Sequence, residues 1–127
     1  SLGNLWDRAD DVLGAGPMLV QGGQVYVTTK LEKFGNDVAG GRAPRTAIGR
    51  TKQGNVLLVV VDGRQQKSIG MTLTEIAILM QELGAEDAMN LDGGGSSEMV
   101  VGNEVMNRPS DGRERSVGAV LAVFPKK

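Results

Sequence analysis

The sequence contains no cysteine and no histidine. Their absence excludes disulfide bonds, thiol nucleophiles, imidazole bases and the serine–histidine triad. It also deprives zinc of its usual sulfur and nitrogen ligands. Any chemistry that this chain performs must therefore come from carboxylates, hydroxyls, guanidinium groups and backbone amides.

An excess of one charge and long apolar runs are missing as well. Lysine and arginine number 14 against 15 aspartates and glutamates, so the net charge is −1 and no global field attracts nucleic acid or anionic lipid. No segment reaches the roughly 18 consecutive apolar residues of a transmembrane helix, and no basic-then-apolar leader is visible. We therefore expect no nucleic-acid partner and no membrane insertion, and any anion-binding site must be local.

Hydrophobic periodicity predicts the elements of one domain, residues 1–127. The clearest helix covers residues 72–83, where Thr72 and Glu75 fit a capping box and Gly84 marks the end. A shorter helix is predicted within residues 5–14, and the polar stretch 28–44 is predicted to be a long loop. Runs rich in β-formers predict strands at residues 18–20, 24–27, 46–50, 56–61, 88–91, 97–101, 104–106 and 117–124.

The order of these elements indicates the fold class. Glycine-rich turns at 22–23 and 52–55 predict two hairpins, and the strands outnumber the helices. We expect an α+β fold, a mixed and mainly antiparallel sheet with one long and one short helix packed on it.

A run of three glycines follows the predicted strand 88–91, in the stretch Asp92-Gly93-Gly94-Gly95-Ser96-Ser97. Glycines allow positive φ and let the backbone approach a ligand closely with several N–H donors, which suits an anionic or sugar oxygen. The simpler alternative is a wide turn between strands. The spacing is not that of a dinucleotide-binding GxGxxG motif.

Other polar groups cluster at the ends of predicted elements. Asp62-Gly63-Arg64 ends one strand, and Arg45 and Thr46 open the strand before it, so that charged groups project from rigid elements. The loop NRPSDGRER adds further guanidinium groups, which bind phosphate or carboxylate in a bidentate way. The alternatives are a turn with a surface ion pair for the first motif and a solvated charge run for the loop. Thr72 is read first as a helix cap, although helix N-termini also attract anions.

Five motifs in this order resemble the phosphodiester glycosidases related to the uncovering enzyme: GAGPMLVQGG, PRTAIG, LLVVVDGR, GMTLTEIAILMQELGAEDAMNLDGGGSSEMVV and NRPSDGRERSVGAVLAV. The resemblance covers residues 14–123. It implies hydrolysis of a sugar-1-phosphodiester of the N-acetylglucosamine-1-phosphate type and a location outside the cell or in its envelope. Domains of this family are usually longer, which implies that strands of the full domain precede this chain.

The resemblance also implies a set of site residues. It places Asp62, Asp92 and Arg64 in catalytic positions. It places substrate-binding groups at Arg45, Thr46, Thr72, Asn90, Gly93, Gly94, Ser96, Ser97, Asn107, Arg108 and Arg113.

Glycoside hydrolysis normally uses two carboxyl groups, here Asp62 and Asp92. A phosphate monoester leaving group, with a second pKa of about 6, needs less protonation than a sugar hydroxyl, so arginines can replace much of the acid. We expect no cofactor; the alternative is a calcium or magnesium ion at Asp92 with Asp62 or Asn90. A non-catalytic module that binds glycan phosphates or envelope polymers is the rival function. A structural fragment that completes its sheet through a homo-oligomer or an added N-terminal segment is a third possibility.

Overall fold

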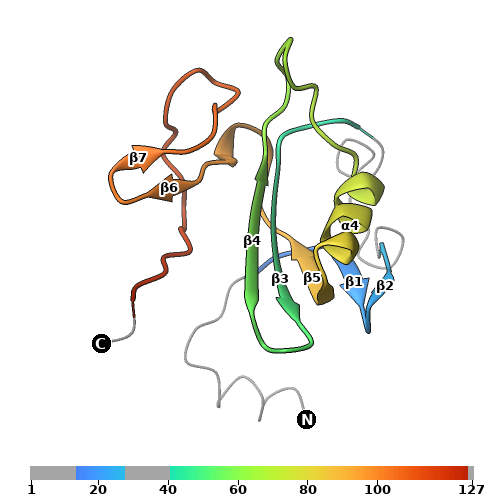
Figure 1. Ribbon diagram of the computed structural model, residues 1–127. Coiled ribbons are helices and arrows are strands. Elements are labelled where there is room, and N and C mark those ends of the chain that lie inside the picture. The colour runs from blue at the N-terminus through green and yellow to red at the C-terminus, as the bar shows by residue number, and fades with distance from the viewer. Residues whose placement is uncertain (1–13, 28–40, 126–127) are drawn as a thin grey trace.

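The computed structural model describes residues 14–27 and 41–125. Its main element is a five-stranded sheet in the order β2-β1-β5-β3-β4 in which all neighbouring strands are antiparallel (Figure 1). This confirms the predicted α+β class with a mainly antiparallel sheet, as well as both predicted hairpins. The strands are β1 (Met18–Gln21), β2 (Gln24–Val25), β3 (Arg45–Thr51), β4 (Val56–Val61) and β5 (Ala85–Asn90).

Helix α4 (Leu73–Glu82) covers one face of this sheet. Its capping box is formed as predicted, because Thr72 Oγ1 accepts from Glu75 N and Glu75 Oε1 accepts from Thr72 N. The helix ends before Gly84, whose φ of 93° suits glycine. Its fully buried residues meet the inner face of the sheet to form the core, which comprises Leu19, Val20, Ala47, Leu73, Ile76, Ala77, Met80, Ala85 and Ala88.

The predicted second helix is not confirmed. Within the described ranges, α4 is the one α-helix, accompanied by a short 3-10 turn, η1 (Gly94–Ser96). The expected short helix at 5–14 and most of the expected loop 28–44 lie outside the described residues.

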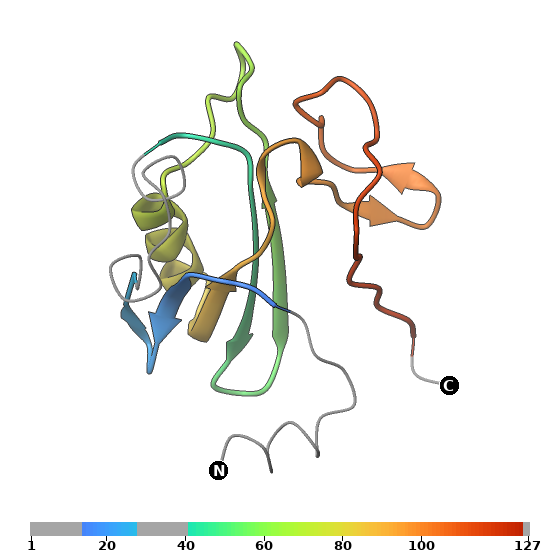
Figure 2. The same ribbon diagram turned by 180° about the vertical axis from the view of Figure 1, so that it is seen from behind.

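A small second sheet lies on the side of β4 away from α4, as both views show (Figures 1 and 2). It consists of β6 (Val100–Val101) and β7 (Glu104–Val105), joined by the predicted turn at Gly102, which has a φ of 62°. Both strands are shorter than predicted. Just before β6, Met99 N donates to Asn107 Oδ1, and Met99 O accepts from Met106 N at 2.7 Å.

The predicted strand at 117–124 is wrong. This segment has no strand in the structure, and its apolar side chains are exposed. A run of β-formers becomes a strand only where a neighbouring strand accepts its hydrogen bonds, and no strand in the described part of the chain pairs with it.

Antiparallel pairing brings the start of β3 and the ends of β4 and β5 to the same end of the large sheet. Arg45, at the start of β3, pairs with Val61 at the end of β4. Ala47 pairs with Asn90 at the end of β5. The motifs that begin or end at these positions are therefore neighbours.

The sheet face opposite α4 is partly apolar and open. Val56 and Leu58 are exposed there, and a shallow hollow of about 270 Å³ is lined by side chains that include Met18, Ile48 and Met89. The expectation of a homo-oligomer or an added N-terminal segment stays a prediction. Within 14–27 and 41–125, no helix has the length and apolar character needed to cross a membrane.

Candidate active site

Three loops meet around the segment that leads into β3. A Cβ atom at Gly63 would lie 2.6 Å from Pro44 N, one at Gly70 would lie 2.5 Å from Ala43 O, and one at Gly93 would lie 2.8 Å from Pro44 O. All three positions therefore exclude a side chain. The glycines of the DGR, GMT and DGGG motifs let the backbones of these loops pack directly against the segment before β3, at this end of the sheet.

Charged side chains of the protein itself also pack against the glycine run. Gly94 N donates to Pro44 O at 2.9 Å, and Gly94 has a φ of 60°. A Cβ at Gly94 would lie 3.4 Å from Arg64 Nη1, and one at Gly95 would lie 2.5 Å from Asp111 Oδ2. The turn thus holds a guanidinium over one glycine and a carboxylate over the next. Close approach to a ligand by the same backbone stays a prediction.

Arg64 is an exposed cation with an unusual backbone. Its φ is 55°, the left-handed region that non-glycine residues occupy at a cost of about 1 kcal/mol or more. Its guanidinium forms no hydrogen bond or ion pair with any residue in 14–27 or 41–125. Strain that is kept at a free cation is typical of a functional position.

Arg45 is a second guanidinium nearby, and it is only 4% exposed. It donates from Nε to Met71 O at 2.9 Å and from Nη2 to Gly41 O at 2.7 Å. Burial lowers its pKa, and the charge of Arg64 lowers it further. The two cations therefore raise the local potential in a protein whose net charge is −1.

Asp62 is committed to loop contacts. Its Oδ1 accepts from Asn107 Nδ2 at 3.0 Å, and both carboxylate oxygens accept from Arg108 N, at 3.0 and 3.1 Å. Its backbone carbonyl accepts from Ser68 Oγ at 2.7 Å. Asp62 therefore fastens the 107–108 segment to the end of β4. A catalytic role for it stays a prediction.

Asp92 differs from Asp62 because it is exposed and free. It follows β5 and precedes the glycine turn. Among the described residues, no side chain or backbone group pairs with its carboxylate. It is the sequence-predicted carboxylate that remains available to a substrate.

The predicted substrate-binding residues Thr46, Thr72, Asn90 and Ser97 differ in how their polar side-chain atoms are hydrogen-bonded. Thr72 and Asn90 have structural partners: Thr72 caps α4, and Asn90, 5% exposed, donates from Nδ2 to Gly16 O and Leu91 O. The hydroxyls of Thr46 and Ser97 and the Oδ1 atom of Asn90 are buried without a hydrogen-bond partner among the described residues. Buried polar atoms normally hydrogen-bond, so these three oxygens are exceptions in the described part of the chain.

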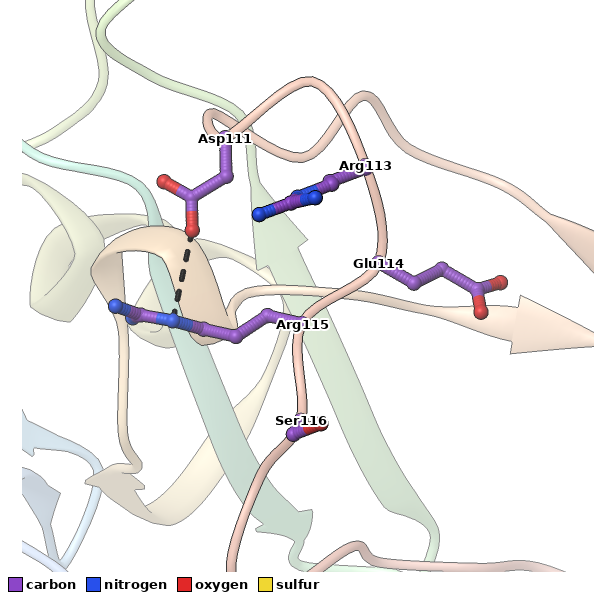
Figure 3. Close-up of a pocket in the computed structure, with 5 residues that line it drawn as sticks. All are labelled: Asp111, Arg113, Glu114, Arg115 and Ser116. Atoms are coloured by element: carbon purple, nitrogen blue, oxygen red, sulfur yellow. Dashed lines mark ion pairs between the residues drawn. The ribbon is translucent and has the colours of Figure 1, made fainter.

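A pocket of about 470 Å³ lies in the loop after β7 (Figure 3). Arg113, predicted as a substrate contact, lines it. Asp111 and Arg115 also line it and form an ion pair of 3.5 Å. Arg113, Arg115 and Asp111 point to one side of the loop, whereas Glu114 points away.

The sequence-predicted site residues do not include Asp111 and Arg115, although the loop that carries them was predicted to contribute. No spacing in the sequence indicates the contact of Asp111 with the glycine run. Gly95 was the one glycine left out of the predicted site, and it is the one that a carboxylate covers.

The described residues offer no group of three or more carboxylates that could hold a metal ion. The calcium or magnesium alternative, built on Asp92 with Asp62 or Asn90, stays a prediction.

Comparison with known proteins identifies the relatives of the chain. The family model for phosphodiester glycosidases, NAGPA, matches residues 3–124. The N-acetylglucosamine-1-phosphodiester alpha-N-acetylglucosaminidase of Mus musculus is 29% identical over 106 residues, which cover 73% of this chain and 20% of the mouse protein.

Two solved structures share the fold. The catalytic domain of the zebrafish enzyme of the same name, autoinhibited by its pro-peptide, is 29% identical with a TM-score of 0.67, over 77% of this chain and 34% of that one. A candidate exported protein of Burkholderia pseudomallei is 52% identical with a TM-score of 0.54, over 55% of this chain and 14% of that one. The chain thus spans about a fifth of the mouse protein and about a third of the zebrafish domain.

Proposed function

Because the chain belongs to the phosphodiester glycosidase family, we propose that it hydrolyses the bond between C1 of a sugar and a phosphodiester oxygen. The mouse and zebrafish relatives carry N-acetylglucosamine-1-phosphodiester in their names. A sugar-1-phosphodiester of that type is the substrate class that we assign to this chain.

One observation carries the proposal. Arg64 holds an unpaired guanidinium in a strained conformation against Gly94, on the same turn that Asp92 opens. A phosphodiester at this turn would meet a free cation, with the buried charge of Arg45 behind it. Preorganised cations that face developing negative charge are a major source of catalysis.

The reaction follows from these charges. A water molecule attacks C1, the bond from C1 to the bridging oxygen breaks, and the electron pair of that bond stays on the phosphate. Arg64 stabilises the new charge on the leaving phosphate monoester, and Arg108 and Arg113 supply further positive charge from their loop. Asp92 stabilises the positive charge at C1, and a second carboxylate takes the proton of the water. The products are a free sugar and a phosphate monoester.

The test is sugar release from UDP-N-acetylglucosamine and from a simple α-N-acetylglucosamine-1-phosphodiester. The parent chain is compared with Asp92→Asn and Arg64→Ala. Glu104→Gln is the matched control, because Glu104 lies exposed in β7. We expect release by the parent and the control, and a loss of about 100-fold or more in both site variants. A folded parent that releases no sugar would overturn the proposal.

A binding module without turnover is the second candidate. It is favoured by the state of Asp62, because hydrogen bonds already occupy that carboxylate and leave Asp92 as the free member of the predicted pair. Calorimetry with the same diester separates the two functions. A binder retains ligand and shows no release, whereas an enzyme with Asp92→Asn retains ligand and loses release.

We also propose that the protein acts in the cell envelope or outside the cell. The candidate exported protein from Burkholderia pseudomallei, 52% identical where it aligns, supports this location. Fractionation of the source cells tests it, and recovery of the protein in the cytosol alone would contradict it.

A further inference from the structure

Asp111 meets the glycine turn more closely than any predicted site carboxylate. Its Cγ, Oδ1 and Oδ2 atoms all lie within 2.9 Å of the position that a Cβ atom at Gly95 would occupy. Asp92 lies three residues before Gly95, a span of about 10 Å at most. Asp92 is thus at the start of the short turn that Asp111 contacts at Gly95, and the guanidinium of Arg64 lies against Gly94 between these two positions.

Asp111 is not a structural anchor. Its one ion pair, to Arg115, joins side chains that are 42% and 52% exposed. Pairs of that kind contribute about 0–1 kcal/mol to stability. A carboxylate that adds so little to the fold and still covers a glycine is free to act on a ligand.

Asp62 explains how Asp111 is held there. The hydrogen bonds from Asn107 and Arg108 to Asp62 fix the start of the loop, and Gln65 Nε2 donates to Arg108 O at 2.6 Å. Gly112 N donates to Pro109 O at 3.0 Å and closes a turn that presents Asp111. The contacts of Asp62 thus fix the position of the loop that carries Asp111.

We infer that Asp111 is the second carboxylate of the reaction, and that Asp62 is a positioning residue for it. The inference rests on the proposed function and assigns the base of that reaction. Asp111 takes the proton from the water as its oxygen bonds to C1, while Asp92 faces the charge at C1. Arg113 and Arg115 point to the same side as Asp111 and extend the site toward the group beyond the phosphate.

The experiment makes the same change of charge at two places, one in the loop after β7 and one outside it. Asp111→Asn removes the inferred base. Glu104→Gln is the control, because Glu104 lies exposed in β7 and is not among the residues that line the pocket or cover the glycine turn. Sugar release from the α-N-acetylglucosamine-1-phosphodiester is measured for the parent and both variants.

We expect Asp111→Asn to lower kcat by about 100-fold or more, because the base is lost. KM should be unchanged or lower, because a negative charge near the anionic substrate is removed. Its melting temperature should match that of the parent. Asp62→Asn should lower the melting temperature and kcat together, because it loosens the loop. Turnover by Asp111→Asn within threefold of the parent would overturn the inference.

A second readout does not depend on turnover. Binding of α-N-acetylglucosamine 1-phosphate is measured by calorimetry for the same three proteins. Loss of a nearby negative charge should tighten the binding of this anion several-fold in Asp111→Asn and not in Glu104→Gln.

The two readouts separate the two proposals. If the parent releases no sugar but Asp111→Asn alone binds the phosphate more tightly, the hydrolase proposal fails and the position of Asp111 beside the ligand stands. If the parent releases no sugar and the two variants bind alike, or the parent binds no sugar phosphate, the inference fails as well.

Discussion

Asn107 Nδ2 donates to Asp62 Oδ1 at 3.0 Å and joins the loop after β7 to the end of β4. The same nitrogen donates to Ser97 O at 2.8 Å, and Asn107 Oδ1 accepts from Met99 N at 2.8 Å. One amide side chain therefore links three segments of the candidate site, and its importance for stability can be measured.

Asn107→Ala should lower the free energy of unfolding by about 2 kcal/mol, because it leaves Asp62, Ser97 and Met99 with unmet hydrogen bonds. Urea unfolding measures the change. Asn103→Ala is the control, since Asn103 is exposed in the β6–β7 turn and has no side-chain partner among the described residues. Equal stability of the two variants would show that the link contributes nothing.

Thr72 should act as a helix cap and not as a substrate contact, because its hydroxyl and its N–H both bond to Glu75. Thr72→Ala should cost about 1 kcal/mol, whereas Thr72→Asp, which also caps, should match the parent within about 0.5 kcal/mol. A carboxylate at a phosphodiester contact would repel the substrate. Loss of sugar release in a stable Thr72→Asp variant would therefore indicate that Thr72 contacts the substrate.

The free energy of unfolding should fall at acid pH because two carboxyl groups, those of Glu75 and Asp87, become protonated. The N–H of Thr72 and then the Arg42 guanidinium hold the pKa of Glu75 below its ordinary 4.5. Arg50 and then Gly22 N hold that of Asp87 below 3.8. The unfolded chain takes up these protons at higher pH than the folded one. Their stabilisation is therefore complete above the unfolded values and is lost as the pH falls through the lowered ones.

Thermal unfolding between pH 7 and pH 3 checks this dependence. Glu75→Gln keeps the capping box but does not titrate, so its melting temperature should fall less steeply below about pH 4.5. Glu82→Gln, on an exposed residue near the end of α4, is the control and should follow the parent. Parallel curves for all three proteins would contradict the role of Glu75.

Local signals in the sequence were sufficient for most of the sheet and for α4. The capping box, the glycine at 84 and the two-residue turns specify their elements without distant contacts. The predicted strand at 117–124 failed because strand formation depends on a neighbour that the local pattern does not encode.

The sequence named candidate site residues but not the contacts that each of them makes. Sequence placed Asp62 and Asp92 alike at strand ends. Only the fold shows that the first carboxylate is bonded to a loop 45 residues away and that the second is free. The contact between Gly95 and Asp111 joins residues that are distant in sequence, so no spacing rule could have found it.

The left-handed backbone at Arg64 gives a test in which stability and function separate. Arg64→Gly and Arg64→Ala both remove the guanidinium, but only the alanine keeps a Cβ at a φ of 55°. Arg64→Gly should therefore be the more stable of the two by about 1 kcal/mol in urea unfolding. Both should lose sugar release by about 100-fold or more, because neither can meet the phosphate, and Arg64→Lys should recover part of it. Equal stability of the glycine and alanine variants would mean that the left-handed conformation carries no strain. Full turnover in either would remove Arg64 from the site.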